Sequence, residues 1–409
     1  MPSLKILILL VLVGFALFDA LVDLLNWIRL PAGNDADATR TREYQKEHLK
    51  IGAIETAVQL TFWALVFHFP ILDILDEQTA RLIPPTTTTA QALQGSAWII
   101  AVSLIRQALS LPFSWFSTFS IEQRYGFNRT TPSTFVLDRI KGLVIGITIG
   151  APLLALLLYF FGALGVNAWW VAWIVVTGFS LGLGYLAPAI ILPLFNRFKP
   201  LEAGELRSAI EGYAQKENFA MGGTFVMDGS KRSSKRNAFF TGFGRFKKLV
   251  LFDTLIEKHT RDELMAIVAH EMGHFKLGHI PRMIGVSIAT QGALFWVMGL
   301  FLAHPDAPVW IRETLLLTEP SIAGAFLLMS LLYAPLGKVL SVISLALSRK
   351  HEFEADQYSK ATYGKAEALI SALKMLEKDH LGHPNPHPLK VWMEYSHPPV
   401  SERARALGV

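Results

Sequence analysis

The sequence predicts a mainly α-helical, polytopic membrane protein with seven transmembrane helices and a small α+β domain outside the lipid. Hydrophobic residues make up 52% of its 409 residues and charged residues only 17%, whereas ordinary soluble domains carry about 25% charge. The apolar residues lie in blocks of about 20 or more, the length that a helix needs to cross the hydrocarbon. Two long polar segments, 196–282 and 348–409, supply the residues for the additional domain.

The apolar blocks place the expected transmembrane helices. Each block is long enough to span a bilayer, and the fourth and fifth contain no charged side chain. We expect five helices within residues 1–195 and two more within residues 283–347, at about 4–28, 53–75, 97–120, 143–165, 169–195, 283–303 and 322–347.

Some of these blocks contain charged residues, among them Asp19, Asp23, Asp73 and Arg106. Charges are costly in lipid, so such side chains usually face a bundle interior or a water-filled cavity. A position near the interface, from which the side chain reaches the headgroups, is the alternative. The first block also has the apolar run of a signal peptide, but no A-x-A cleavage site precedes Asp23, which favours a retained helix.

Lysine and arginine residues indicate the orientation. They are frequent after the first and third spans, as in 40–50 and 124–141, and nearly absent from the other short loops. The positive-inside rule therefore places these two loops, and the segments 196–282 and 348–409, in the cytoplasm, with the N-terminus outside. The net charge of +5 then reflects membrane topology, so we expect contact with membrane lipid and no nucleic-acid partner.

The first polar segment has both helical and strand patterns. Thr260 and Glu263 have the spacing of a capping box, in which each residue's side chain bonds the other's backbone N–H at the start of a helix. An amphipathic pattern predicts a helix over 202–218, and we expect short strands over 224–227 and 249–252. The capping box predicts a helix over about 261–279.

The helix expected after Thr260 carries a metal-binding pattern. The chain has no cysteine, so a metal would be held by His, Asp or Glu. His270 and His274 lie four residues apart on one helix face, from which both imidazoles can reach a single ion. Glu271 is offset by about 100° and can reach a water molecule beside them. This is the HExxH arrangement of zinc peptidases.

A third ligand is expected because catalytic zinc usually has three protein ligands and one open position. His279 lies on another helix face from His274, so we expect it to cap the helix end instead. Glu352 and Asp356 share a face of a later helix, with Glu354 pointing away. One carboxylate would ligate the metal and the other would accept a hydrogen bond from a ligand histidine; the spacing leaves open which is which.

These residue types fit peptide hydrolysis. Zinc polarises a scissile carbonyl and lowers the pKa of its water towards about 7. Glu271 would take the proton and pass it to the leaving amine. The oxyanion needs a further donor, for which His397 is the candidate.

Six stretches along most of the chain carry a family resemblance: 122–128 (EQRYGFN), 237–244 (NAFFTGFG), 251–254 (LFDT), 270–279 (HEMGHFKLGH), 348–356 (SRKHEFEAD) and 395–403 (YSHPPVSER). Together with seven spans, they resemble the type I CAAX prenyl protease family of integral-membrane zinc metalloproteases.

The resemblance implies a specific site and fold. Seven helices would enclose a large water-filled chamber with the zinc site on the cytoplasmic side. One Zn²⁺ would be held by His270, His274 and Glu352, with Glu271 as general base. The resemblance also assigns supporting roles. Asp356 would orient a ligand, and His397 would stabilise the transition state. Asn237 would bind the substrate, and Arg403 would support the site.

The resemblance also implies a substrate. Members cleave after a prenylated cysteine and release the last three residues, so we expect a peptide or protein substrate with a possibly prenylated C-terminus. A quality-control metalloprotease of broad specificity is the alternative, although such enzymes have about four spans. A transporter or an inactive scaffold is disfavoured by the intact HExxH. The tail 406–409 lacks a dilysine signal, which favours a bacterial inner membrane over the endoplasmic reticulum.

Overall fold

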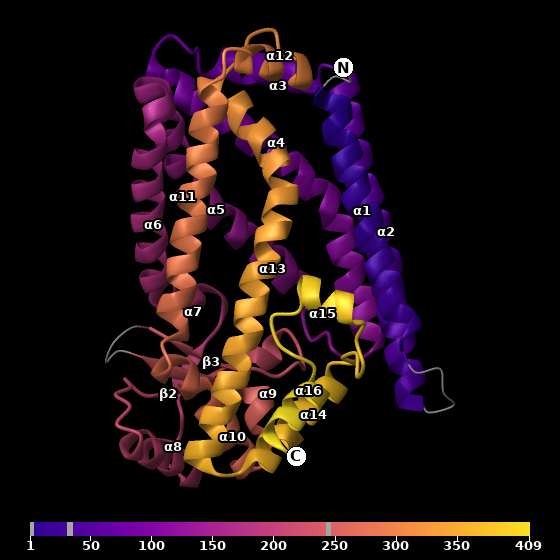
Figure 1. Ribbon diagram of the computed structural model, residues 1–409, viewed down its shortest axis with the longest axis vertical. Coiled ribbons are helices and arrows are strands. Elements are labelled where there is room, and N and C mark those ends of the chain that lie inside the picture. The colour runs from indigo at the N-terminus through magenta and orange to yellow at the C-terminus, as the bar shows by residue number, and fades with distance from the viewer. Residues whose placement is uncertain (1–3, 31–35, 243–246) are drawn as a thin grey trace.

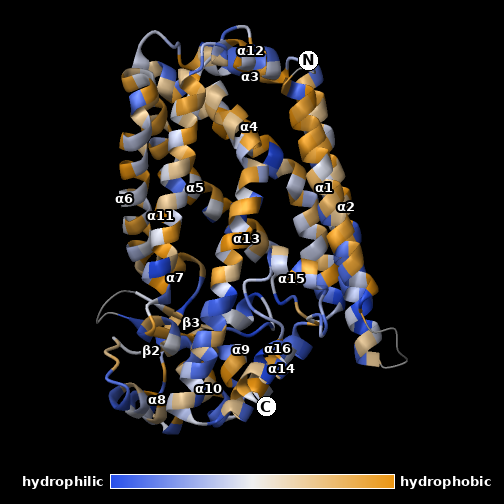
Figure 2. Ribbon diagram, viewed as in Figure 1, coloured by the Kyte–Doolittle hydropathy of each residue, from blue (hydrophilic) through white to orange (hydrophobic). Residues whose placement is uncertain are grey.

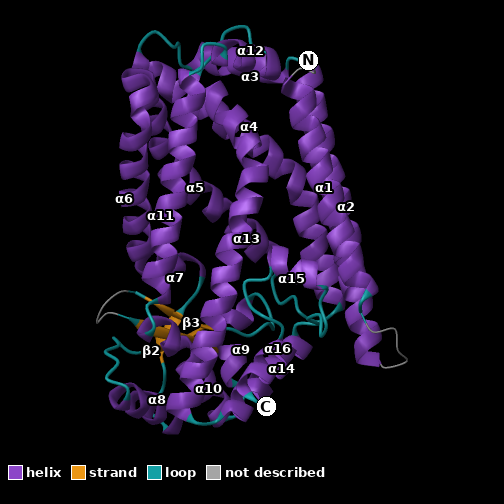
Figure 3. Cartoon of the chain, in the orientation of Figure 1, coloured by secondary structure: helices purple, strands orange, loops and turns teal. Residues whose placement is uncertain are grey.

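The computed structural model describes residues 4–30, 36–242 and 247–409, so the last two residues of the 237–244 motif lie outside the described residues. The chain is mostly helical with one small sheet (Figure 3). Long helices run along the longest axis, and a smaller α+β part lies at one end (Figure 1). The long helices are α1 (Leu4–Ile28), α2 (Ala36–His68), α4 (Thr88–Phe116), α5 (Pro132–Leu164), α6 (Ala168–Ile190), α11 (His279–Ala303) and α13 (Ile322–Tyr363).

Among the described residues, six helical segments are long and apolar enough to cross a membrane. The fourth of them, Pro132–Phe195, contains α5, α6 and the short α7 (Leu192–Phe195). Only 6–28% of the most apolar stretch of each segment is buried within the protein. Figure 2 shows hydrophobic residues along these helices and hydrophilic residues gathered in the α+β part. Exposed apolar surface of this extent needs lipid around it, so the chain is a multi-pass membrane protein.

Helix ends differ from the limits of the apolar blocks. The expected second span at 53–75 crosses Pro70, but α2 already ends at His68, and α3 (Ile71–Leu82) starts after that proline. Proline lacks the N–H that a continuing helix needs. Together with α12 (Ala307–Leu315), α3 lies across the end of the long helices (Figure 1). Conversely, α2 and α13 extend well into polar sequence.

Two charged residues of the apolar blocks form ion pairs with distant parts of the chain. Asp19 on α1 forms an ion pair with Lys338 on α13, and Asp23 pairs with Lys390. Asp73 lies on α3, outside the candidate spans. Pairing lowers the cost of a charge within the membrane, so the two α1 aspartates bind α1 to the C-terminal half of the chain.

The α+β part contains a four-stranded sheet in the order β1-β2-β4-β3. Strands β2 and β4 run parallel, and the two outer strands run antiparallel to their neighbours. The expected strands 224–227 and 249–252 are observed as β2 and β4. The bounds are β1 (Phe198–Pro200), β2 (Thr224–Met227), β3 (Ala238–Thr241) and β4 (Lys248–Phe252), followed by α9 (Asp253–Ile256). The expected helix 202–218 is α8 (Glu205–Lys216).

Helix α10 (Arg261–Lys276) runs through the core of the α+β part. The expected capping box starts it: Thr260 N donates to Glu263 Oε2 at 2.9 Å, and Glu263 N donates to Thr260 Oγ1 at 3.4 Å. Helix α10 ends before residue 279, because Gly278 adopts a left-handed conformation with φ +70°. Helix α11 begins at the next residue. The C-terminal helices α14 (Ala366–Asp379), α15 (Pro388–Glu394) and α16 (Val400–Leu407) complete this part.

Candidate metal centre

The site forms where α10 crosses the lower end of α13 (Figure 1). A Cβ at Gly273 on α10 would lie 3.2 Å from the Cα of Ala355 on α13, tighter than ordinary van der Waals contact. Glycine at this position therefore allows the two helix backbones to approach closely. As a result, the HExxH face of α10 meets the ExxxD face of α13.

Three side chains from these helices place their donor atoms together. His270 Nε2 lies 3.2 Å from His274 Nε2 and 3.3 Å from Glu352 Oε2, and His274 Nε2 lies 3.3 Å from Glu352 Oε1. Ligand atoms around a tetrahedral zinc ion, each about 2.1 Å from it, would be about 3.4 Å apart. Glu352 is 4% exposed, and its buried Oε2 also lies 3.5 Å from Arg403 Nη1. The donor set and its spacing therefore fit a metal ion.

Asp356 and Arg403 surround the outer side of His270. Asp356 Oδ1 lies 2.9 Å from His270 Nδ1, which is the ring nitrogen turned away from the cluster. Arg403, from α16, donates to both carboxylate oxygens of Asp356 at 2.8 and 2.6 Å. Asp356 and Arg403 are only 1% and 4% exposed. Asp356 and Arg403 thus form a buried ion pair beside the ring of His270, and Arg403 is covered from solvent.

Burial and hydrogen bonding set the protonation of two groups. Burial alone would lower the pKa of His270, but its hydrogen bonds to Asp356 and Glu352 outweigh this and raise the pKa to about 9. Binding of a metal through Nε2 therefore requires loss of a proton. Burial raises the pKa of Glu271, although the neighbouring His270 and His274 oppose the shift. A raised pKa suits a carboxylate that must accept a proton near neutral pH.

The remaining predicted residues differ in their distance from the cluster. His397, in the loop between α15 and α16, places Nε2 3.4 Å from Glu352 Oε1, and its side chain is 63% exposed. It thus lies beside the metal-binding atoms with one face open to a substrate. Asn237 is exposed just before β3, and its Oδ1 accepts from Ala238 N at 2.9 Å. Within the described ranges, no hydrogen bond joins Asn237 to the cluster, although β3 packs against α10.

The sequence argument missed one neighbour of the site. His279 was expected on another helix face from His274, yet its Nδ1 lies 3.0 Å from His274 Nδ1. The expectation assumed a continuous helix through 279. Gly278 was the available signal, because glycine commonly terminates a helix in a left-handed conformation.

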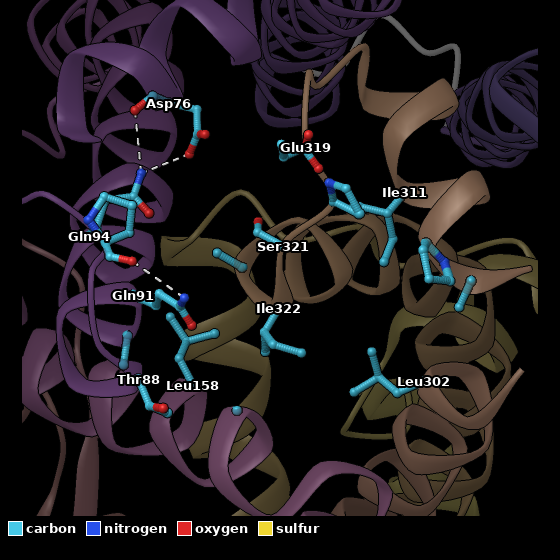
Figure 4. Close-up of a pocket in the computed structure, with 17 residues that line it drawn as sticks. Asp76, Thr88, Gln91, Gln94, Leu158, Leu302, Ile311, Glu319, Ser321 and Ile322 are labelled. Carbon is cyan, nitrogen blue, oxygen red and sulfur yellow. Dashed lines mark hydrogen bonds between the residues drawn. The ribbon is translucent and has the colours of Figure 1, made fainter. Parts of the chain in front are cut away.

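A separate cavity of about 460 Å³ lies at the opposite end of the molecule, among α3, α4, α12 and α13 (Figure 4). On its wall, Gln94 Nε2 donates to Asp76 Oδ1 at 2.7 Å. Of the described residues, none from the histidine–glutamate cluster lines this cavity. It is therefore distinct from the candidate metal centre.

Comparison with known proteins identifies the group to which this chain belongs. The sequence pattern of Peptidase family M48 matches residues 200–408, and the pattern described as CAAX prenyl protease N-terminal, five membrane helices, matches residues 32–197. The chain is 34% identical over 339 residues to CAAX prenyl protease 1 of Saccharomyces cerevisiae, covering 78% of this chain and 73% of that protein. It is 32% identical over 354 residues to the CAAX prenyl protease 1 homolog of Mus musculus, covering 78% and 74%.

A solved structure shares the whole fold. The crystal structure of S. mikatae Ste24p matches with a TM-score of 0.90 and 28% sequence identity, over 100% of both chains. Fold and site thus define a membrane metalloendopeptidase. The chain belongs to peptidase family M48, and it resembles the CAAX-processing enzymes of that family.

Proposed function

We propose that this protein is a zinc-dependent endopeptidase in which His270, His274 and Glu352 hold one Zn²⁺ ion. The observation that carries the proposal is the triangle of donor atoms, with edges of 3.2–3.3 Å, at the contact of α10 and α13. Two imidazoles and one carboxylate form a ligand set typical of catalytic zinc, which keeps a fourth position open. The burial of the Glu352 carboxylate beside both imidazoles supports the same assignment.

The side chains around the ligands have separate roles in this proposal. Bound zinc supplies a Lewis acid and acidifies a water molecule. The Glu271 carboxylate accepts the proton of the attacking water and then donates it to the leaving amine nitrogen. His397 donates from its exposed ring to the developing oxyanion. Asp356, held by Arg403, keeps the Nε2 lone pair of His270 directed at the cluster.

Asn237 is the proposed contact for the substrate backbone. Its amide oxygen is occupied by Ala238 N, which leaves the NH₂ group to donate to a peptide carbonyl. The exposed position of Asn237 before the edge strand β3 supports this role. A peptide bound there would run along the sheet edge towards α10.

The proposed substrate is a peptide or protein C-terminus at the membrane, including prenylated CAAX sequences. The names of the relatives support this class. We further propose that α5 and α6 cross the membrane separately, giving seven spans that enclose a water-filled chamber. Their lengths of 33 and 23 residues support this count. The basic loops support a cytoplasmic site, with the bacterial inner membrane as the proposed location.

Replacement of Glu271 by glutamine tests the mechanism. The purified protein is given a farnesylated CAAX peptide and the same peptide without the prenyl group. Glu271→Gln should retain zinc but lose about 10²–10⁴-fold in cleavage rate, because only the proton acceptor is removed. Glu257→Gln, a change of an exposed glutamate before α10, is the control and should cleave as the wild type does.

Each result has a distinct meaning. Equal cleavage by wild type and Glu271→Gln would contradict the proposed mechanism. Cleavage of the unprenylated peptide alone would remove prenylated substrates from the proposal and retain the endopeptidase. Cleavage of unrelated membrane peptides at similar rates would instead indicate a quality-control protease.

A further inference from the structure

The second histidine of the HExxH motif has a buried neighbour outside the proposed machinery. In a continuous helix, residue 279 would lie about 140° around the axis from His274 and could not touch it. The left-handed Gly278 ends α10 and lets α11 start at His279. This break returns the His279 ring to His274, where it is only 2% exposed.

Two hydrogen bonds connect His274 through His279 to a carboxylate. His274 Nδ1 lies 3.0 Å from His279 Nδ1, and His279 Nε2 lies 2.9 Å from Glu354 Oε2. Arg282 and Lys350 lie within 4 Å of the same carboxylate, at 3.7 and 3.8 Å, and favour its ionised form.

One assignment of protons satisfies the whole chain. If His274 binds a metal through Nε2, its neutral ring carries a proton on Nδ1. That N–H donates to His279 Nδ1, which must then be unprotonated. The proton of His279 is consequently on Nε2, from which it donates to the Glu354 carboxylate. No donor or acceptor of the three side chains along this path is left unpaired.

We propose that His279 and Glu354 are positioning residues that fix the ring orientation and tautomer of His274, as Asp356 does for His270. The inference rests on the proposed role of His274 as a zinc ligand. Both ligand histidines then present Nε2 to the zinc site and have Nδ1 bound to a partner in the protein. Partners of this kind typically change metal affinity or activity by about 10–100-fold when they are removed.

A second metal ion is a competing use of the same residues. His279, His351 and Glu354 offer ligand atoms within 4.8 Å of one another. However, the rings of His279 and His351 are stacked, with centroids 4.1 Å apart and planes 7° from parallel. Lone pairs in two parallel ring planes do not converge on one ion. The two nearby cationic side chains also oppose a cation at Glu354.

Zinc release from the purified full-length protein tests the inference. The rate of zinc transfer to a chromogenic chelator is measured together with zinc per chain, the apparent melting temperature and the cleavage rate. His279→Leu removes both hydrogen bonds. His279→Asn keeps an acceptor near the Nδ1 position, and Glu354→Gln keeps an acceptor but removes the charge. His351→Phe retains the stacked ring without a ligand nitrogen and is the matched control.

We expect His279→Leu to release zinc about 10–100-fold faster than wild type, with kcat reduced more than KM. The zinc-release rates of Glu354→Gln and His279→Asn should lie between those of wild type and His279→Leu. His351→Phe should release zinc at the wild-type rate and hold one zinc per chain. If His279→Leu does not fold, Glu354→Gln and His279→Asn provide the comparison.

Two outcomes would overturn the inference. Zinc release at the wild-type rate from every His279 and Glu354 variant would remove their positioning role. Two zinc ions per wild-type chain, with one lost in His351→Phe, would show a second metal site instead. A wild-type protein that binds no zinc or cleaves no peptide would contradict the proposed function itself, which is a separate result.

Discussion

The ion pair behind the metal centre gives the sharpest stability prediction. Replacement of Arg403 by methionine keeps most of the side-chain volume but removes the charge and both hydrogen bonds to Asp356. The carboxylate of Asp356, 1% exposed, would remain buried next to Glu352, with His270 Nδ1 at 2.9 Å as its remaining partner. A buried charge that loses its partner cannot recover its hydration.

The size of the effect follows from the geometry. Two unit charges about 4 Å apart interact by about 4 kcal/mol at an effective dielectric constant of about 20. This agrees with the loss of about 3–5 kcal/mol usually found when one partner of a buried pair is removed. Bound zinc would offset part of the negative charge of Asp356 and Glu352. The loss should therefore be larger in chelator-treated protein than in zinc-loaded protein.

Thermal unfolding of the detergent-purified protein, with zinc and with chelator, measures this loss. At about 2–4 °C per kcal/mol for a part of this size, Arg403→Met should lower the apparent melting temperature by roughly 6–20 °C. Arg405→Met is the matched control, since Arg405 lies on the same helix α16 and is exposed. It should stay within about 0.5 kcal/mol of wild type. Equal melting temperatures for the two variants would refute the reasoning.

Three further predictions concern α10 and the turn that ends it. Thr260→Ala removes one half of the capping box and should cost about 1 kcal/mol in the free energy of unfolding. Burial would raise the pKa of Glu263, but hydrogen bonds from Ser371 and Thr260 outweigh it and lower the pKa below the ordinary 4.5. The ionised Glu263 side chain therefore stabilises the fold fully above about pH 4.5, and this stabilisation is lost as the pH falls through the lower folded-state pKa. Acid unfolding of Glu263→Gln should consequently be less steep than that of wild type. Gly278→Ala forces alanine into a left-handed conformation and should cost about 1–2 kcal/mol and speed zinc release, whereas Gly285→Ala, with open space around its Cβ position, should not.

Local sequence rules were sufficient to predict α10 and the two central strands of the sheet. The capping box placed the start of α10 at Thr260, and the HExxH spacing placed both histidines on one face. Both features depend on residues within four positions of each other, so helix geometry alone relates them. Strands β2 and β4 were likewise recognisable from short apolar runs.

Contacts between distant segments could not be obtained in this way. The spacing of Glu352 and Asp356 left their roles open, whereas the packing of α13 on α10 puts Glu352 against both Nε2 atoms and Asp356 against Nδ1 of His270. Hydropathy likewise located the apolar blocks but not the helix ends, since lipid solvation and backbone hydrogen bonding obey different rules. Pro70, which lacks a backbone N–H to donate, therefore ends one helix inside an apolar block.

The length of α13 has a practical consequence for handling the protein. Its 42 residues correspond to about 63 Å at 1.5 Å per residue, roughly twice the hydrocarbon thickness of a bilayer. Glu352 and Asp356 lie in the last third of this one helix, and its apolar N-terminal part packs among the other long helices. A water-soluble peptidase fragment cannot be excised without cutting the helix that carries a proposed zinc ligand. Detergent or lipid is therefore part of any preparation in which this site is intact.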